Sequence, residues 1–218
     1  MAKRLGRRRF ITASLALVAV TARAADEEEV APGEDLMREH GVLRRVMLVY
    51  EEIMRRLATR QDVPLDVVSA GAGIVRRVIE DYHERLEEEF LFPRFEKAGT
   101  LTDLVAVLRT QHKAGRAVTA DVLRLAKAPA RSDADRTLLA DRLRAFNRMY
   151  RPHASREDTV LFPAFHDIVG GKAYAELGEQ FEDREKRVLG ESGFGGAVKE
   201  VARLEAALGI HDLATYTP

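Results

Sequence analysis

The sequence contains no cysteine and no tryptophan, and its formal net charge is zero. The lack of cysteine excludes disulfides, thiolate metal sites and cysteine nucleophiles. The balanced charge gives no reason to expect nucleic-acid binding. Six histidines remain, so any transition-metal site in this chain must be built from imidazole and carboxylate groups.

Strand patterns are also scarce, because alternation of apolar and polar residues is not sustained anywhere in the chain. Apolar residues recur instead at helical spacing, interrupted by proline, glycine and helix-start motifs. We therefore predict an all-α fold, an up-down-up-down four-helix bundle over residues 35–170 with a helical extension over 171–218. The expected helices cover residues 34–59, 64–93, 100–126 and 132–170, followed by two short helices at 172–189 and 197–208.

The first residues have the pattern of an export signal. Five basic residues occur between Lys3 and Arg9, an apolar run covers 13–20, and Ala22-Arg23-Ala24 resembles a cleavage site. We predict a signal peptide at 1–24, of the twin-arginine type or an ordinary secretory one, followed by an acidic linker at 25–34. The apolar run is too short to span a bilayer. We thus expect a periplasmic or otherwise exported protein that meets the export machinery and has no membrane span in its mature form.

One pattern occurs twice, as His83 to Pro93 and again as His153 to Pro163. Both copies read His-x3-Glu-x3-Leu-Phe-Pro, so we infer an internal duplication. In an α-helix, residues four positions apart lie on one face. Each copy therefore points one imidazole and one carboxylate in the same direction. These groups belong to His83 and Glu87 in the first copy and to His153 and Glu157 in the second.

The duplication also extends upstream, where Leu36-x3-His40 matches Leu108-x3-His112. Four helices would then supply four imidazoles and two carboxylates to one core. Burying unpaired carboxylates costs several kcal/mol each, roughly, and a metal cluster removes that cost. The set suits two metals with bridging carboxylates. The predicted ligands are His40, His83, Glu87, His112, His153 and Glu157.

These motifs, together with Glu39-His40, resemble the hemerythrin-like proteins of the HHE cation-binding family over about residues 35–168. The resemblance implies a non-haem di-iron centre, in which the four histidines are terminal ligands and Glu87 and Glu157 are bridges. An oxo or hydroxo group would complete the bridge between two iron ions. We favour iron over zinc, with manganese as a less favoured alternative. Oxygen carriers of the family use a fifth histidine, whereas this chain has Tyr82 beside His83.

Other residues have weaker predicted roles. Tyr50, Tyr82 and Tyr150 are candidates for hydroxyl groups that bond the metal ligands, with an ordinary place at the edge of the core as the alternative. Glu88 is a candidate for orienting an imidazole. His166 and His211 are expected on the surface.

The sequence marks no organic-substrate pocket and no acid–base pair apart from the metal ligands. We therefore favour an exported binding protein that holds iron and a small ligand such as O2, NO or peroxide, for sensing, storage or stress protection. A di-iron oxidoreductase that reduces NO or peroxide, or an iron-centre repair protein, is the alternative. A metal-free structural bundle is the third reading, and the buried carboxylates argue against it.

Overall fold

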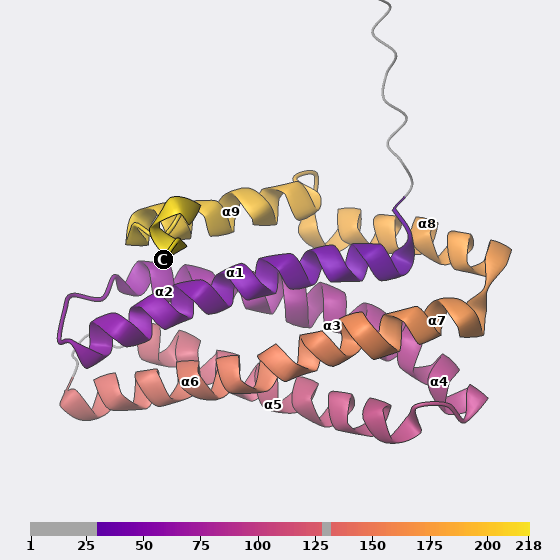
Figure 1. The fold of residues 1–218 in the computed structure, drawn as a ribbon, viewed down its shortest axis with the longest axis horizontal. Coiled ribbons are helices and arrows are strands. Elements are labelled where there is room, and N and C mark those ends of the chain that lie inside the picture. Colours follow the sequence, from indigo (N-terminus) through magenta and orange to yellow (C-terminus); the bar gives the residue numbers. More distant parts are fainter. Residues whose placement is uncertain (1–29, 128–131) are drawn as a thin grey trace, which may run out of the picture.

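A computed structural model describes residues 30–127 and 132–218. The predicted signal peptide and residues 25–29 of the predicted linker lie outside the described residues. Every regular element of the described part is a helix (Figure 1), which confirms the all-α class. The elements are α1 Pro32–Ala58, α2 Leu65–Ile74, η1 Val75–His83, α3 Glu84–Leu86, η2 Glu87–Leu91, α4 Phe92–Ala98, α5 Thr102–Ala126, α6 Asp133–Arg156, η3 Glu157–Leu161, α7 Phe162–Val169, α8 Gly171–Leu189, α9 Gly193–Leu208 and η4 Leu213–Tyr216.

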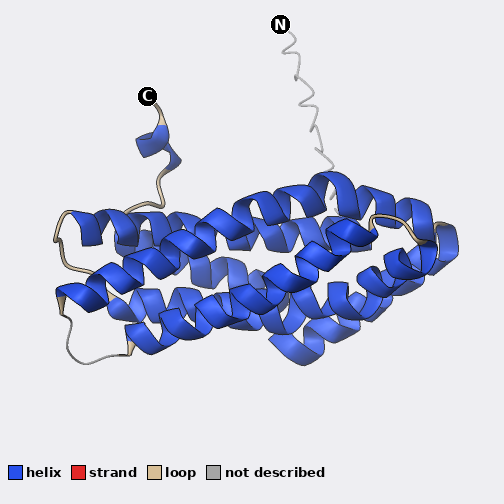
Figure 2. Cartoon of the chain, turned by 90° about the horizontal axis from the view of Figure 1, so that it is seen from below, coloured by secondary structure: helices blue, strands red, loops and turns tan. Residues whose placement is uncertain are grey.

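Four long helical segments form the body of the molecule: α1, the continuous run α2–α4, α5, and the run α6–α7. They lie side by side along the long axis in both views (Figures 1 and 2). Each packs against two others, since α1 contacts α2 and α6, and α5 contacts the same two elements. The apolar side chains between them form two clusters, and the predicted ligands fall at the level between these clusters.

Two predicted boundaries need correction. The predicted linker ended at residue 34, but α1 begins at Pro32, so residues 32–34 belong to the helix. Proline suits a first helical position because its fixed φ is already helical. Glu34 and Asp35 in the first turn stabilise the helix, because their negative charges lie at the positive end of its dipole. The last helix was predicted to begin at residue 197, but α9 begins at Gly193.

Pro93 does not end its helical segment, which continues to Ala98. The turn before it, η2, is a wide π-helical turn in which the Phe92 N–H donates to the carbonyl of Glu87, five residues back. The second copy repeats this arrangement, with η3 directly before α7, whose second residue is Pro163. Proline then occupies the second position of the renewed α-helix, where its missing N–H costs little. Each wide turn begins at one of the two predicted glutamate ligands.

The C-terminal extension covers one side of the bundle. In Figure 1, α8 and α9 lie along α1; α8 also contacts η1, and α9 contacts α2. In the part of the chain that the structure describes, no helix is long and apolar enough to cross a membrane.

Candidate metal centre

The six predicted ligands converge at mid-length in the bundle, and all of them are buried. One histidine comes from each long segment, and the two glutamates begin the wide turns η2 and η3. The histidines form two pairs: the rings of His40 and His83 lie 4.6 Å apart, and those of His112 and His153 lie 5.2 Å apart. The four imidazoles therefore form two pairs that face one centre.

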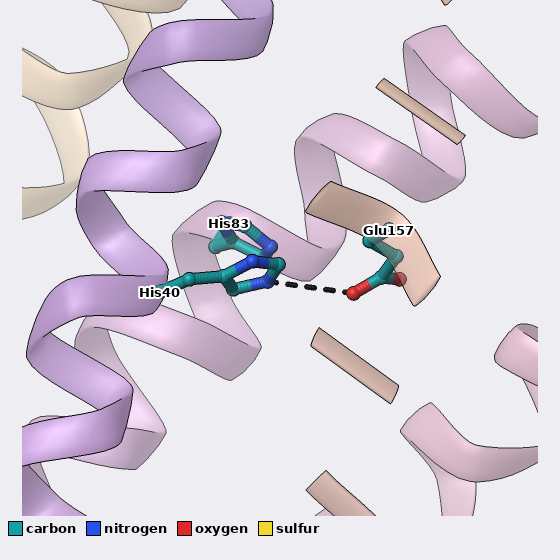
Figure 3. A group of neighbouring side chains, drawn as sticks. All are labelled: His40, His83 and Glu157. Atoms are coloured by element: carbon teal, nitrogen blue, oxygen red, sulfur yellow. Dashed lines mark ion pairs between the residues drawn. The ribbon is translucent and has the colours of Figure 1, made fainter. Parts of the chain in front are cut away.

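Glu157 reaches both histidine pairs. Its Oε2 atom lies 3.4 Å from Nε2 of His40 and 3.1 Å from Nε2 of His153. Figure 3 shows the carboxylate of Glu157 pointing toward His40, with His83 on the same side. His40, His83 and Glu157 have ligand atoms close enough to hold one ion, and His112, His153 and Glu157 could hold another. Glu157 is therefore placed to bridge two ions.

Glu87 connects the same two pairs through their other members. Its Oε2 atom lies 3.6 Å from Nε2 of His83 and 3.3 Å from Nε2 of His112. Within 4.0 Å, each carboxylate thus contacts one imidazole of each pair. This crossed arrangement is the geometry expected for two carboxylate bridges.

Six of the ligand atoms lack hydrogen-bond partners within the protein. Both oxygens of Glu87 and of Glu157, and Nε2 of His83 and of His112, are buried without such a partner. Leaving buried polar groups unpaired costs about 1–3 kcal/mol each, and more for charged groups. Since the orphaned atoms are nitrogen and oxygen donors that point to one centre, the residues fit a pair of bound metal ions.

The outer nitrogen of each imidazole is held by a polar side chain from a different helical segment. In each case Nδ1–H donates to a side-chain oxygen, which leaves Nε2 as the nitrogen that faces the centre. The four bonds run from His40 to Asp158 (2.6 Å), from His83 to Glu39 (2.6 Å), from His112 to Glu88 (3.1 Å) and from His153 to Gln111 (2.8 Å).

The sequence predicted a possible orienting role for Glu88, and in the structure Glu88 makes this contact. The orienting roles of Glu39, Gln111 and Asp158 were not predicted. The duplication contained the information that could have identified them. Glu39 and Gln111 each precede a ligand histidine, 72 positions apart (111 minus 39), and Glu88 and Asp158 each follow a ligand glutamate, 70 positions apart (158 minus 88). The same two offsets relate the ligands themselves, so the repeat includes the groups that orient them.

Two phenylalanines explain why the repeated motif ends in Leu-Phe-Pro. Phe92 stacks on the ring of His112 at 5.4 Å, and Phe162 stacks on the ring of His40 at 5.5 Å. Both phenylalanines are buried. Each covers one member of a histidine pair with apolar surface, which excludes water and fixes the imidazole plane.

The charges of the centre show that protons occupy it when no metal is bound. Burial lowers the pKa of His40 and of His112, but their bonds to carboxylates outweigh this and raise the pKa values to about 9 and about 10. Burial and the nearby Glu157 raise the pKa of Glu87 to about 8. Burial also acts to raise the pKa of Glu157, but His153 and His40 hold it well below its usual range.

The three tyrosines lie in the core, and their hydroxyl groups do not bond the predicted ligands. The hydroxyl of Tyr82 donates to the backbone carbonyl of Phe181 at 3.2 Å, and that of Tyr150 donates to Glu84 at 2.7 Å. Neither bonds a predicted ligand, although the ring of Tyr150 lies edge-on to His153 at 5.3 Å. The ring of Tyr50 packs edge-on against Phe146. Spacing along a helix places a ring near a site but does not determine the partner of its hydroxyl. His166 and His211 are exposed, as predicted.

Comparison with known proteins gives a family match. The model of the hemerythrin HHE cation-binding domain matches residues 31–165. A protein of Mycobacterium tuberculosis (strain H37Rv) and one of Mycobacterium bovis, both described as uncharacterized, are each 48% identical over 193 residues, covering 88% of this chain and 76% of theirs. No solved structure matches.

Proposed function

Because the chain belongs to the hemerythrin HHE cation-binding family, we propose that it is an exported non-haem di-iron protein that binds a small ligand such as O2, NO or peroxide. The proposed fold of the domain is the up-down-up-down bundle typical of four-helix proteins. Its support is the direction of successive segments in Figure 1, which alternates along the long axis.

One observation carries the proposal: each of the two buried carboxylates faces one imidazole from each histidine pair. Glu157 spans the pairs through His40 and His153, and Glu87 spans them through the other two histidines. A single ion would need only one histidine pair. Two histidine pairs, connected by two carboxylates, favour two ions with the carboxylates as bridges.

The donor set favours iron. Imidazole and carboxylate suit Fe²⁺, Fe³⁺ and Mn²⁺, and no thiolate is present to favour softer metals. When bound, the iron pair supplies a centre that can coordinate a diatomic or peroxide ligand. The protein orients the imidazoles through their Nδ1 bonds, and Phe92 and Phe162 shield the centre from water.

We propose ligand binding rather than turnover, for sensing, storage or stress protection. The acidic groups next to the ligands are used for orientation: Asp158 and Glu39 each accept from an imidazole at 2.6 Å. They are fixed on metal ligands, which leaves them poorly suited to act on a separate organic substrate. The proposed place of action is the periplasm or another exported location, reached through the signal peptide at residues 1–24.

Metal analysis and optical spectroscopy test this function. The purified chain should contain two iron ions, and its spectrum should change reversibly with O2 or NO, or on addition of peroxide. Retention of zinc alone, or of no transition metal after supply of Fe²⁺, would contradict the di-iron proposal. Consumption of NO or peroxide over many cycles would show that the protein is an enzyme and contradict the binding-only part.

A further inference from the structure

A cavity of about 510 Å³ lies where the start of α1 meets α8 and the start of α9. Figure 1 shows α8 passing beside this end of α1. Three carboxylates line the cavity, one from α1 and two from α8: Asp35, Glu182 and Glu185. The extension therefore builds a chamber against the metal-binding bundle that the bundle alone does not have.

The cations at this cavity leave an acidic excess. Arg38 and Lys186 also line it, and Arg38 lies over the ring of Phe194 at 5.0 Å from the ring centre. Lys186 is 4.0 Å from Glu182. Glu185 accepts the backbone N–H of Phe194 with one oxygen at 2.6 Å, so the chain fixes its carboxylate in place.

Glu39 connects this cavity to the metal centre. It lies one helical turn after Asp35 on α1 and has no exposed surface. One of its oxygens, Oε2, accepts from His83 at 2.6 Å, while the other, Oε1, is buried without a hydrogen-bond partner. Residues four positions apart lie on one face of a helix, and helical side chains lean toward the N-terminus. Glu39 therefore lies next to Asp35, which lines the cavity.

We propose that this cavity is the entry site through which a divalent cation reaches the buried centre. Asp35, Glu182 and Glu185 attract a hydrated Fe²⁺ ion, and the spare oxygen of Glu39 receives it on the inner side. Carboxylate oxygens suit this step because they bind hard divalent cations and replace part of the hydration shell. The route ends at His83, the ligand that Glu39 already holds. This inference rests on the proposed metal-binding function and assigns a role to the C-terminal extension.

The test measures the rate of metal uptake by the metal-free full chain. Co²⁺ is the probe, because its visible absorption reports coordination without redox chemistry, and Fe²⁺ is added under anaerobic conditions in a parallel series. The variant Asp35→Asn removes a cavity charge with little change of shape. The matched control is Glu34→Gln, which removes a charge from the neighbouring exposed residue of the same helical turn.

We expect Asp35→Asn to slow uptake at low salt at least fivefold, with final metal content and spectrum unchanged, and Glu34→Gln to load like the wild type. Added salt should slow the wild type more than Asp35→Asn, because it screens the attraction. Glu182→Gln changes a more exposed residue of the cavity and should slow uptake in the same way. This variant keeps the test possible if Asp35→Asn fails to fold.

Equal uptake rates for the wild type and both cavity variants would overturn the entry site while leaving the metal centre intact. A cavity variant that loads less metal at equilibrium would also overturn it, because its residue would then be part of the centre. A wild type that binds neither cation would overturn the proposed function itself, and the entry site with it.

Discussion

The two halves of the bundle have the same ligands but different surroundings. In the first pair, His40 and His83 both donate to carboxylates, those of Asp158 and Glu39. In the second pair, His112 donates to a carboxylate, but His153 donates to the amide of Gln111. A carboxylate partner makes an imidazole a more basic ligand than an amide does. The two proposed metal positions would therefore be chemically unequal within a symmetric set of ligands.

The halves differ again beyond the ligands. Arg44 pairs with Asp158 in one half and Arg116 pairs with Glu88 in the other, so this contact is duplicated. The bond from Tyr150 to Glu84 is not duplicated, because the residue seventy positions after Glu84 is Ala154, which cannot accept a hydrogen bond through its side chain. Duplication thus preserved what holds the metals, whereas the groups around them diverged and gave each position its own environment.

Removal of a bridging carboxylate should have the largest effect and should affect both halves equally. We expect Glu157→Gln and Glu87→Gln each to lose most of the bound iron, because each carboxylate faces both histidine pairs. Iron content after gel filtration measures this. If either variant kept one full ion in one pair, the carboxylate would serve a single position and the crossed bridge would be wrong.

Acid should weaken metal binding steeply and should act through one histidine of each half. His40 and His112 have raised pKa values of about 9 and about 10, so both hold a proton at neutral pH that the metal must displace. Each displaced proton lowers affinity by about tenfold per unit fall in pH. Chelator competition between pH 7 and 8 should therefore show a change of at least about 100-fold in the combined affinity for two ions, because Glu87, with a pKa of about 8, also loses a proton in this range. Proton release can be measured with an indicator dye. A pH-independent affinity would contradict the protonated resting centre.

Exchange of the outer partners should shift the balance between the halves. In the first pair, Glu39→Gln replaces the carboxylate that bonds His83 by an amide, the group that already bonds His153 in the second pair. We expect metal affinity to fall by roughly 10- to 100-fold. Gln111→Glu makes the reverse change and should strengthen binding at the second pair. Equilibrium competition with a chelator measures both. Changes of the same sign in the two variants would show that the partner's charge does not set the difference.

A glycine substitution should have the smallest effect and tests the packing that only one half contains. A Cβ atom at Gly115 would lie 2.0 Å from the hydroxyl oxygen of Tyr150, whereas one at Gly73 would meet nothing within 4 Å. Gly115→Ala should lower the free energy of unfolding by about 1–3 kcal/mol. The matched control Gly73→Ala should raise it by about 0.5–1 kcal/mol, because alanine favours the helix. Urea unfolding measures both, and equal shifts would refute the close approach.

The sequence could predict that these six side chains meet, because the pattern that contains them is local and occurs twice. His83 and Glu87 lie on one helical face whatever the rest of the chain does, and the second copy supplied the register. The all-α class followed from periodicity for the same reason.

Features that depend on partners from other segments were harder to predict. Glu39 precedes His40 in the chain but bonds His83 on another helix, and the hydroxyl of Tyr82 bonds Phe181 in the extension. The apolar periodicity also did not predict the wide turns before Pro93 and Pro163, because one extra residue in a turn barely alters helical spacing. The 70- and 72-residue offsets were the available signal for the orienting groups.

X-ray diffraction from crystals of the iron-loaded chain, recorded on both sides of the iron absorption edge, tests the central claim most directly. We predict two anomalous peaks per chain, one beside His40 and His83 and one beside His112 and His153, with Glu87 and Glu157 between them. A single peak, or peaks that do not touch both carboxylates, would contradict the two-ion centre.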